Sequence, residues 1–324
     1  MKNLLLILLS PDAYLWLSAL LLAILTLALL LLWRRCRRRW LARSLAVLLL
    51  ILWYVFLWGS LVGVRYLEVR HVEYTSEDLP SAFDGYRIVQ FSDAHVPTYT
   101  GWRRELLRQA VDSINAQHGD LIVFTGDLQN KEPTEIEPFC SELSRLKAKD
   151  GVYSVLGNHD YAMYLDVDLY QQARNLEATV DCETRAGWHV LVNQRHKIHR
   201  GGDSIYIAGM ENDGEGRFPQ LGDLVCTLHG LSRESFVVML EHDPTSWRRK
   251  ILPHSHCQLT LSGHTHGGQF SLFGWSPASL RCHEYAGLYY MGDRAINVST
   301  GLSGVIPFRF GVPPEIVVIT LRKK

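Results

Sequence analysis

The chain has 324 residues, enough for one large domain or two small ones, and its content of 47% hydrophobic and 20% charged residues is that of ordinary folded proteins. Disorder of the whole chain is therefore not expected. Lysine plus arginine and aspartate plus glutamate each number 33. Because there is no excess of positive charge, we expect no nucleic-acid partner.

Two segments near the N-terminus are almost wholly apolar, Tyr14–Trp33 and Ser44–Val64. At ~1.5 Å per helical residue, each is long enough to cross the ~30 Å hydrocarbon layer of a bilayer. No small-residue cleavage site follows Trp33, so the first segment is not typical of a signal peptide. We therefore expect a transmembrane helical hairpin over residues 1–65, with the bilayer as its partner.

The connection between these helices contains six arginines, which are Arg34, Arg35, Arg37, Arg38, Arg39 and Arg43. A buried helical pair in a soluble protein is the alternative, but a core would have to supply partners for all of these charges. Short loops rich in arginine stay in the cytoplasm. This loop predicts a cell-membrane protein whose folded domain is extracytoplasmic, although Arg65 and Arg70 oppose that topology.

A short connector over residues 66–80 is expected to lead into one α/β domain over residues 81–324. Five apolar runs in the domain read as buried strands, at 86–91, 120–125, 151–156, 235–240 and 257–262. Helix-prone segments lie at about 102–116 and 135–149. This alternation predicts a largely parallel sheet, which binds ligands at the carboxyl ends of its strands.

Each of the five runs stops at a group of polar residues. These groups supply carboxylate, imidazole and amide side chains but no thiolate, which favours divalent ions other than a structural zinc. The candidates are Asp93, His95, Asp127, Asn158, His159, Asp160, His242, His264 and His266. Two ions that share a carboxylate would use most of them, as in sites that act on phosphoryl groups.

The five groups, in this order, resemble the signature blocks of the calcineurin-like metallophosphoesterases, written D-x-H, G-D, G-N-H-D, H and G-H-x-H. The string SGHTHGGQ over Ser262–Gln269 and the C-terminal tail resemble the membrane-associated branch of YkuE-like and YaeI-like proteins. The resemblance runs from about Ala82 to the C-terminus. It implies an α/β fold, a β-sandwich of two mixed sheets flanked by helices, here preceded by the transmembrane hairpin.

The resemblance also implies a cofactor of two divalent metal ions, Mn, Zn or Fe. The family pattern assigns Asp93, His95, Asp127 and His266 to one ion and Asp127, Asn158, His242 and His264 to the other. Asp127 is then the bridge, and a hydroxide bridging the ions is the nucleophile.

Two further residues are expected to be catalytic. His159 would face the phosphoryl group, and Asp160 would orient its ring. Gln129 and Asn130 stand where protein phosphatases of the superfamily have an Asp-Arg pair, which disfavours a phosphoprotein substrate.

The sequence thus predicts a membrane-anchored phosphoesterase that hydrolyses a phosphomonoester, phosphodiester or pyrophosphate of a small molecule or lipid. One alternative is a UDP-diacylglucosamine pyrophosphatase of lipid A synthesis, which requires a cytoplasmic site. Another is a non-catalytic membrane protein that binds a lipid or a partner through this fold. No protein partner is inferred.

The aromatic residues Phe270, Phe273 and Trp275 either pack on the domain or contact lipid.

Overall fold

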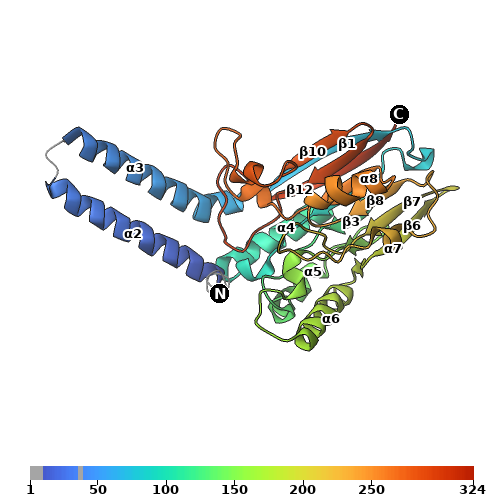
Figure 1. Ribbon diagram of the computed structural model, residues 1–324, viewed down its shortest axis with the longest axis horizontal. Helices are drawn as coiled ribbons and strands as arrows, with labels where there is room; N and C mark the ends of the chain where they lie inside the picture. The colour runs from blue at the N-terminus through green and yellow to red at the C-terminus, as the bar shows by residue number, and fades with distance from the viewer. Residues whose placement is uncertain (1–9, 36–38) are drawn as a thin grey trace.

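Figure 1 shows a pair of long helices that projects from an α/β domain. The structure, a computed structural model, describes residues 10–35 and 39–324. Cys36, Arg37 and Arg38 of the arginine-rich connection lie outside the described residues.

The projecting pair consists of α2 (Pro11–Arg35) and α3 (Arg39–Leu57), which we call the apolar hairpin. A π-helical turn, Trp58–Val62, and a 3₁₀ turn, Gly63–Arg65, continue α3 into the domain. Both helices are long and apolar enough to cross a membrane, and most of their large side chains are exposed. The two contact each other through a hydrogen bond of 3.1 Å from Trp53 Nε1 to Thr26 Oγ1.

The domain contains two six-stranded sheets. The first has the order β1 (Glu68–Ser76), β12 (Glu315–Lys323), β2 (Arg87–Phe91), β3 (Leu121–Phe124), β4 (Val152–Ser154) and β5 (His189–Val190). The second has the order β10 (Gly287–Met291), β11 (Arg294–Val298), β9 (Leu259–Ser262), β8 (Val237–Leu240), β7 (Asp203–Gly209) and β6 (Gln194–Arg200).

Both sheets are mixed, as the family resemblance predicted. In the first sheet only the β12–β2 pair is antiparallel, and in the second the β10–β11 and β6–β7 pairs are. The strand pattern alone had predicted one largely parallel sheet. The predicted strands instead divide between two sheets, because an apolar run shows that a strand is buried but not which strand it pairs with.

The segment expected to be a connector, residues 66–80, belongs to the domain. It contains β1, which pairs in parallel with β12 along the edge of the first sheet. Its strand character is easy to miss because only Tyr74 and Ser76 of this edge strand are buried.

Helices cover the outer faces of both sheets. α4 (Arg104–Ala116), α5 (Cys140–Leu143) and α6 (Leu169–Arg185) lie on the first, and α7 (Leu224–Leu228) and α8 (Leu252–His254) flank the second. The helix expected over 135–149 is reduced to α5 and short 3₁₀ turns. Pro138 explains this difference, since proline cannot donate the backbone hydrogen bond of a helix interior.

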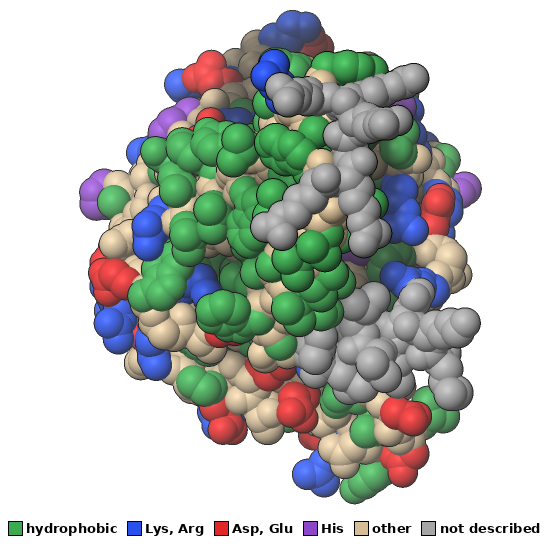
Figure 2. Space-filling model, turned by 90° about the vertical axis from the view of Figure 1, so that its left-hand side faces the viewer, with side chains coloured by type: hydrophobic (Ala, Val, Ile, Leu, Met, Phe, Trp, Pro, Cys, Tyr) green, Lys and Arg blue, Asp and Glu red, His purple; other side chains and the backbone are tan. Residues whose placement is uncertain are grey.

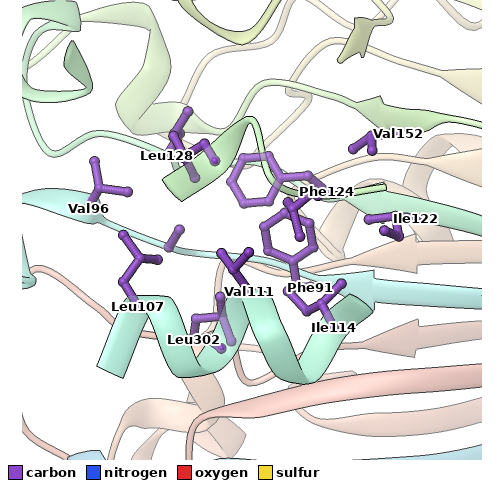
Figure 3. Packing of buried hydrophobic residues seen from close by; sticks show 14 of the residues in the cluster. Phe91, Val96, Leu107, Val111, Ile114, Ile122, Phe124, Leu128, Val152 and Leu302 are labelled. Atoms are coloured by element: carbon purple, nitrogen blue, oxygen red, sulfur yellow. The ribbon is translucent and has the colours of Figure 1, made fainter. Parts of the chain in front are cut away.

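Alternation along the strands builds separate cores on the two faces of the first sheet. In β2, Ile88 packs between the sheets and Val89 packs beneath the helices. On the helix side, the Phe91 and Phe124 rings have centroids 4.8 Å apart, and α4 covers them with Val111 and its apolar neighbours (Figure 3). These strands are buried on both faces, so the loops at their carboxyl ends have a rigid base.

The joint between the hairpin and the domain is tight. Arg309 donates its backbone N–H to the Gly59 carbonyl at 2.9 Å, and a Cβ on Gly63 would lie 1.7 Å from the Arg309 carbonyl oxygen. At the start of α2, Asp12 pairs with Arg103 at 2.6 Å. Both helices are thus attached to the domain.

Gly63→Ala should loosen this joint, because the new methyl group cannot fit beside a backbone carbonyl. We expect a loss of roughly 2 kcal/mol of stability, the usual scale of overpacking, and a lower Tm for the detergent-solubilised protein. Gly202→Ala is the matched control, since nothing lies within 4 Å of its added Cβ. Equal Tm values for the two variants would show that the joint does not stabilise the protein.

Candidate metal centre

The predicted ligands all follow strands that point to one edge of the sandwich. Asp93 and His95 follow β2, Asp127 follows β3 and Asn158 follows β4, all in the first sheet. The second sheet contributes the remaining histidines, His242 after β8 and His264 and His266 after β9.

Many of these residues have a left-handed backbone, which is uncommon outside glycine. They are Asp93, His95, Asp127, His264 and His266, with φ between 40° and 72°. Conformations of this kind cost about 1–3 kcal/mol each and gather at functional sites.

One group contains Asp93, His95, Asp127 and His266, each with a ligand atom within 4.8 Å of the others. His95 Nε2 lies 3.7 Å from Asp127 Oδ2, and His266 Nε2 lies 3.6 Å from Asp93 Oδ1. His95 Nε2 is buried and has no hydrogen-bond partner. A buried polar atom without a partner needs an explanation, and a metal ion among these groups provides one.

A second group contains Asp127, His242 and His264, again within 4.8 Å of one another. His242 Nε2 lies 3.2 Å from Asp127 Oδ2, and Asn158 Oδ1 lies 2.8 Å from His264 Nδ1. The structure therefore brings together all seven predicted ligands, with Asp127 common to both groups. This donor set of carboxylate, imidazole and amide fits two divalent ions.

The opposite ring nitrogens of three histidines face oxygen acceptors. Nδ1 of His95 faces Asn130 Oδ1 at 2.8 Å, Nδ1 of His242 faces the Thr125 carbonyl at 2.6 Å, and Nδ1 of His266 faces the Ser303 carbonyl at 3.1 Å. A carbonyl oxygen can only accept, so Nδ1 carries the proton and Nε2 keeps its lone pair for a metal. Asn130 thus orients a predicted ligand, His95.

Burial also sets the protonation of the first group. It lowers the pKa of His95 to about 3, which keeps this imidazole neutral, as ligation requires. Burial would by itself raise the pKa of Asp127, but the neighbouring His242 and His159 lower it well below its ordinary value. Asp127 is therefore an anion between two groups of histidines.

The expected role of Asp160 needs correction. Its carboxylate does not orient His159, whose Nδ1 faces the Asn130 carbonyl at 2.7 Å. Asp160 instead accepts the backbone N–H groups of Gly157, Asp127, Leu128 and Gln129. The Asp160 carboxylate thus fixes the loops that carry Asp127 and Asn158. The Asn130 carbonyl, rather than Asp160, sets the orientation of the His159 ring.

Sequence reasoning missed Asp243, although it directly follows a predicted ligand. Its Oδ2 is buried without a hydrogen-bond partner and lies 3.5 Å from His264 Nε2. Burial lowers the pKa of the His264 imidazole, and the nearby charge of Asp243 opposes this change. Asp213, another residue that the sequence analysis did not select, is buried and pairs with Arg249 and Lys250.

Arg309 is the second residue that the sequence did not indicate, since no motif surrounds it. Its buried guanidinium donates to four backbone carbonyls, those of His266, Thr300, Gly301 and Ser303. Burial lowers its pKa only to about 10, so it stays charged at neutral pH. Because His266 Nδ1 faces the Ser303 carbonyl, Arg309 holds both the backbone and the ring partner of a predicted ligand.

A cleft of about 690 Å³ opens onto the two groups. Asp127, His159 and His264 lie in its wall, together with Arg217 and Arg281. Neither arginine forms an ion pair within the described ranges, so both are free to meet an anionic ligand.

The calcineurin-like phosphoesterase family matches residues 86–268. The chain belongs to this family. It is similar to the uncharacterized metallophosphoesterase YkuE of Bacillus subtilis, with 33% identity over 279 residues that cover 82% of this chain and 90% of that one. A transmembrane protein with metallophosphoesterase domain from Danio rerio is 28% identical over 292 residues, which are 87% of this chain and 63% of that longer protein.

Solved structures share the fold at low identity. The phosphopantetheinyl hydrolase of Mycobacterium tuberculosis has a TM-score of 0.41 and 13% identity, covering 66% of this chain and 88% of its own. A dimetal phosphatase of Danio rerio has a TM-score of 0.38 and 12% identity, covering 68% and 90%.

Arg309→Met should weaken the metal centre from a distance. Four buried carbonyls would lose a donor, so we expect a loss of roughly 3 kcal/mol or more and a lower metal content by elemental analysis. Arg281→Met is the control, because this exposed side chain donates no hydrogen bond to the described part of the protein. Unchanged metal content in Arg309→Met would contradict its positioning role.

Proposed function

We propose that this protein is a membrane-anchored phosphoesterase with two divalent metal ions, which hydrolyses a phosphomonoester, phosphodiester or pyrophosphate. In each case water supplies the oxygen that joins phosphorus, the P–O bond to the leaving group breaks, and the leaving group takes up a proton. One observation carries the proposal: Asp127 belongs to two ligand groups at the base of an open cleft.

The chain's own residues suit the other requirements of the reaction. Bound divalent ions supply a water with its pKa lowered towards ~7 and withdraw charge from the phosphoryl oxygens. Arg217 and Arg281 in the cleft attract an anionic substrate. His159 also lines the cleft, and its Nδ1 donates to the Asn130 carbonyl. Its Nε2 can therefore carry a proton to the leaving oxygen.

Asp127→Asn tests the shared carboxylate. The substitution removes the anion common to both groups, so we expect turnover of bis(p-nitrophenyl) phosphate to vanish and metal content to fall. Both would be measured on the detergent-solubilised protein, by absorbance and by elemental analysis. Full activity in this variant would refute the dinuclear site.

His159→Ala should separate chemistry from metal binding. We expect normal metal content and a rate about 100-fold lower, the usual effect of losing a positioned acid or base. If the parent protein bound metal but cleaved neither bis(p-nitrophenyl) phosphate nor p-nitrophenyl phosphate, the alternative of a non-catalytic binding protein would replace this proposal.

We further propose that the hairpin crosses the cell membrane and that the domain lies outside the cytoplasm. The arginine-rich connection between α2 and α3 supports this topology. Arg65 and Arg70 argue against this topology, but both already have partners in the domain. Arg65 lies 4.3 Å above the Trp102 ring, and Arg70 pairs with Glu315 at 3.1 Å. An external domain would act on envelope or external phosphates.

Reporter fusions at the C-terminus test this topology in cells. Alkaline phosphatase, which folds outside the cytoplasm, should be active there, and a fluorescent protein that matures only in the cytoplasm should stay dark. The opposite pair of results would overturn the topology and favour the UDP-diacylglucosamine pyrophosphatase alternative.

A further inference from the structure

An exposed apolar turn follows the last predicted metal ligand. Leu272 and Trp275 exchange both backbone hydrogen bonds, at 2.9 and 3.0 Å, so Phe273 and Gly274 form a tight two-residue turn. Both turn residues have positive φ, 51° and 82°. Such turns favour Asn-Gly, and an aromatic residue at the first position is unusual. Its side chain is 99% exposed, so packing does not explain it.

The turn is part of a larger surface, which we call the apolar loop, Phe270–Leu280. Its exposed members besides Phe273 are Leu272, Trp275 and Leu280, with 47%, 52% and 76% of their surface exposed. Several large apolar side chains gathered on one loop indicate an interaction surface.

The position of the apolar loop identifies its partner. Phe270 at its base stacks on Phe310 with centroids 5.5 Å apart, and Phe310 meets Tyr54 of α3 at 6.4 Å. Tyr54, Trp58 and Tyr66 form a chain of aromatic rings where α3 ends. Aromatic rings of this kind mark the interface between lipid and water. The apolar loop therefore lies at the level of the proposed bilayer surface.

Figure 2 looks at the side of the molecule from which the hairpin leaves. Hydrophobic side chains gather over the middle and left of this face, and charged side chains lie towards its edges. An apolar centre inside a charged rim suits a bilayer surface.

The apolar loop also borders the cleft. Gly268, Pro277 and Ala278 line the cleft, and Ser276 donates to the Gly267 carbonyl at 2.6 Å, next to the predicted ligand His266. One wall of the cleft is thus continuous with the exposed turn. A ligand with an anionic head and an apolar tail would place its head between Arg217 and the metal groups and its tail over Phe273.

We propose that the apolar loop rests in the bilayer surface and that the substrate is an amphiphilic phosphoester drawn from that bilayer. This inference rests on the proposed phosphoesterase function and adds the substrate class. The head of the lipid enters the cleft, and its chains stay against the loop.

Phe273→Asn is a sharp test, because asparagine suits the turn and removes only the aromatic ring. The full-length protein would be reconstituted in phosphatidylcholine vesicles that contain a dialkylglyceryl p-nitrophenyl phosphate. Methyl p-nitrophenyl phosphate, with the same scissile bond, serves as the soluble substrate. In both, water adds to phosphorus and p-nitrophenolate leaves.

We expect kcat/KM for the vesicle-held ester to fall about tenfold, the scale for losing one buried aromatic contact, while cleavage of the soluble ester is unchanged. Val225→Ser, at an 80% exposed position on α7, should alter neither rate. Equal losses on both esters, or no loss on either, would overturn the proposal while leaving the phosphoesterase function intact.

A readout that does not depend on activity separates the two proposals. A nitrobenzoxadiazole label at Phe273→Cys, with the other accessible cysteines replaced by serine, should be quenched by spin-labelled lipid. The same label at Val225→Cys should not. Absence of quenching at both sites would refute bilayer contact, whereas failure to cleave either ester would refute the enzyme function instead.

Discussion

The position of one buried carboxylate, that of Asp127, constrains the rest of the domain. It lies 3.7 Å from His95 Nε2 and 3.2 Å from His242 Nε2, and these two histidines follow strands of different sheets. The sheets must therefore keep a fixed separation at this edge. A buried hydrogen bond of 2.7 Å from Asn297 Nδ2 of β11 to Gln90 Oε1 of β2 helps to hold it.

The loops around Asp127 depend on buried polar groups for their shape. Asp160 gathers four backbone N–H groups beneath the first-sheet ligands, and Arg309 gathers four carbonyls beneath His266. The hydrogen bonds of Asp160 and Arg309 offset the conformational free-energy cost of the left-handed backbone at Asp127 and His266. Since the backbone of Arg309 also meets Gly59 and Gly63, the same segment joins the apolar hairpin to the metal centre. The hairpin and the cleft thus have a fixed relation.

Much of the organisation could be predicted from the sequence because it depends on local patterns. About twenty consecutive apolar residues define each helix of the hairpin, and the seven predicted ligands lie in the loops that follow five buried strands. Asp93, Asp127 and Asn158 could be identified for this reason, together with the five motif blocks. The strands at these blocks were also predicted within a residue or two, because they are short apolar runs bounded by polar residues.

The sequence by itself determined which residues could bind metal and which helices are apolar enough for a membrane. Only the tertiary structure decided how the strands divide into two sheets, that residues 68–76 form β1, and that Asp160 serves the backbone rather than His159. The tertiary structure also decided the role of Arg309, and it placed Phe270 close to Tyr54 through the ring of Phe310. The physical reason is common to all of these: each depends on contacts between residues far apart in the chain, such as Glu68 with Glu315, and no local pattern records such contacts.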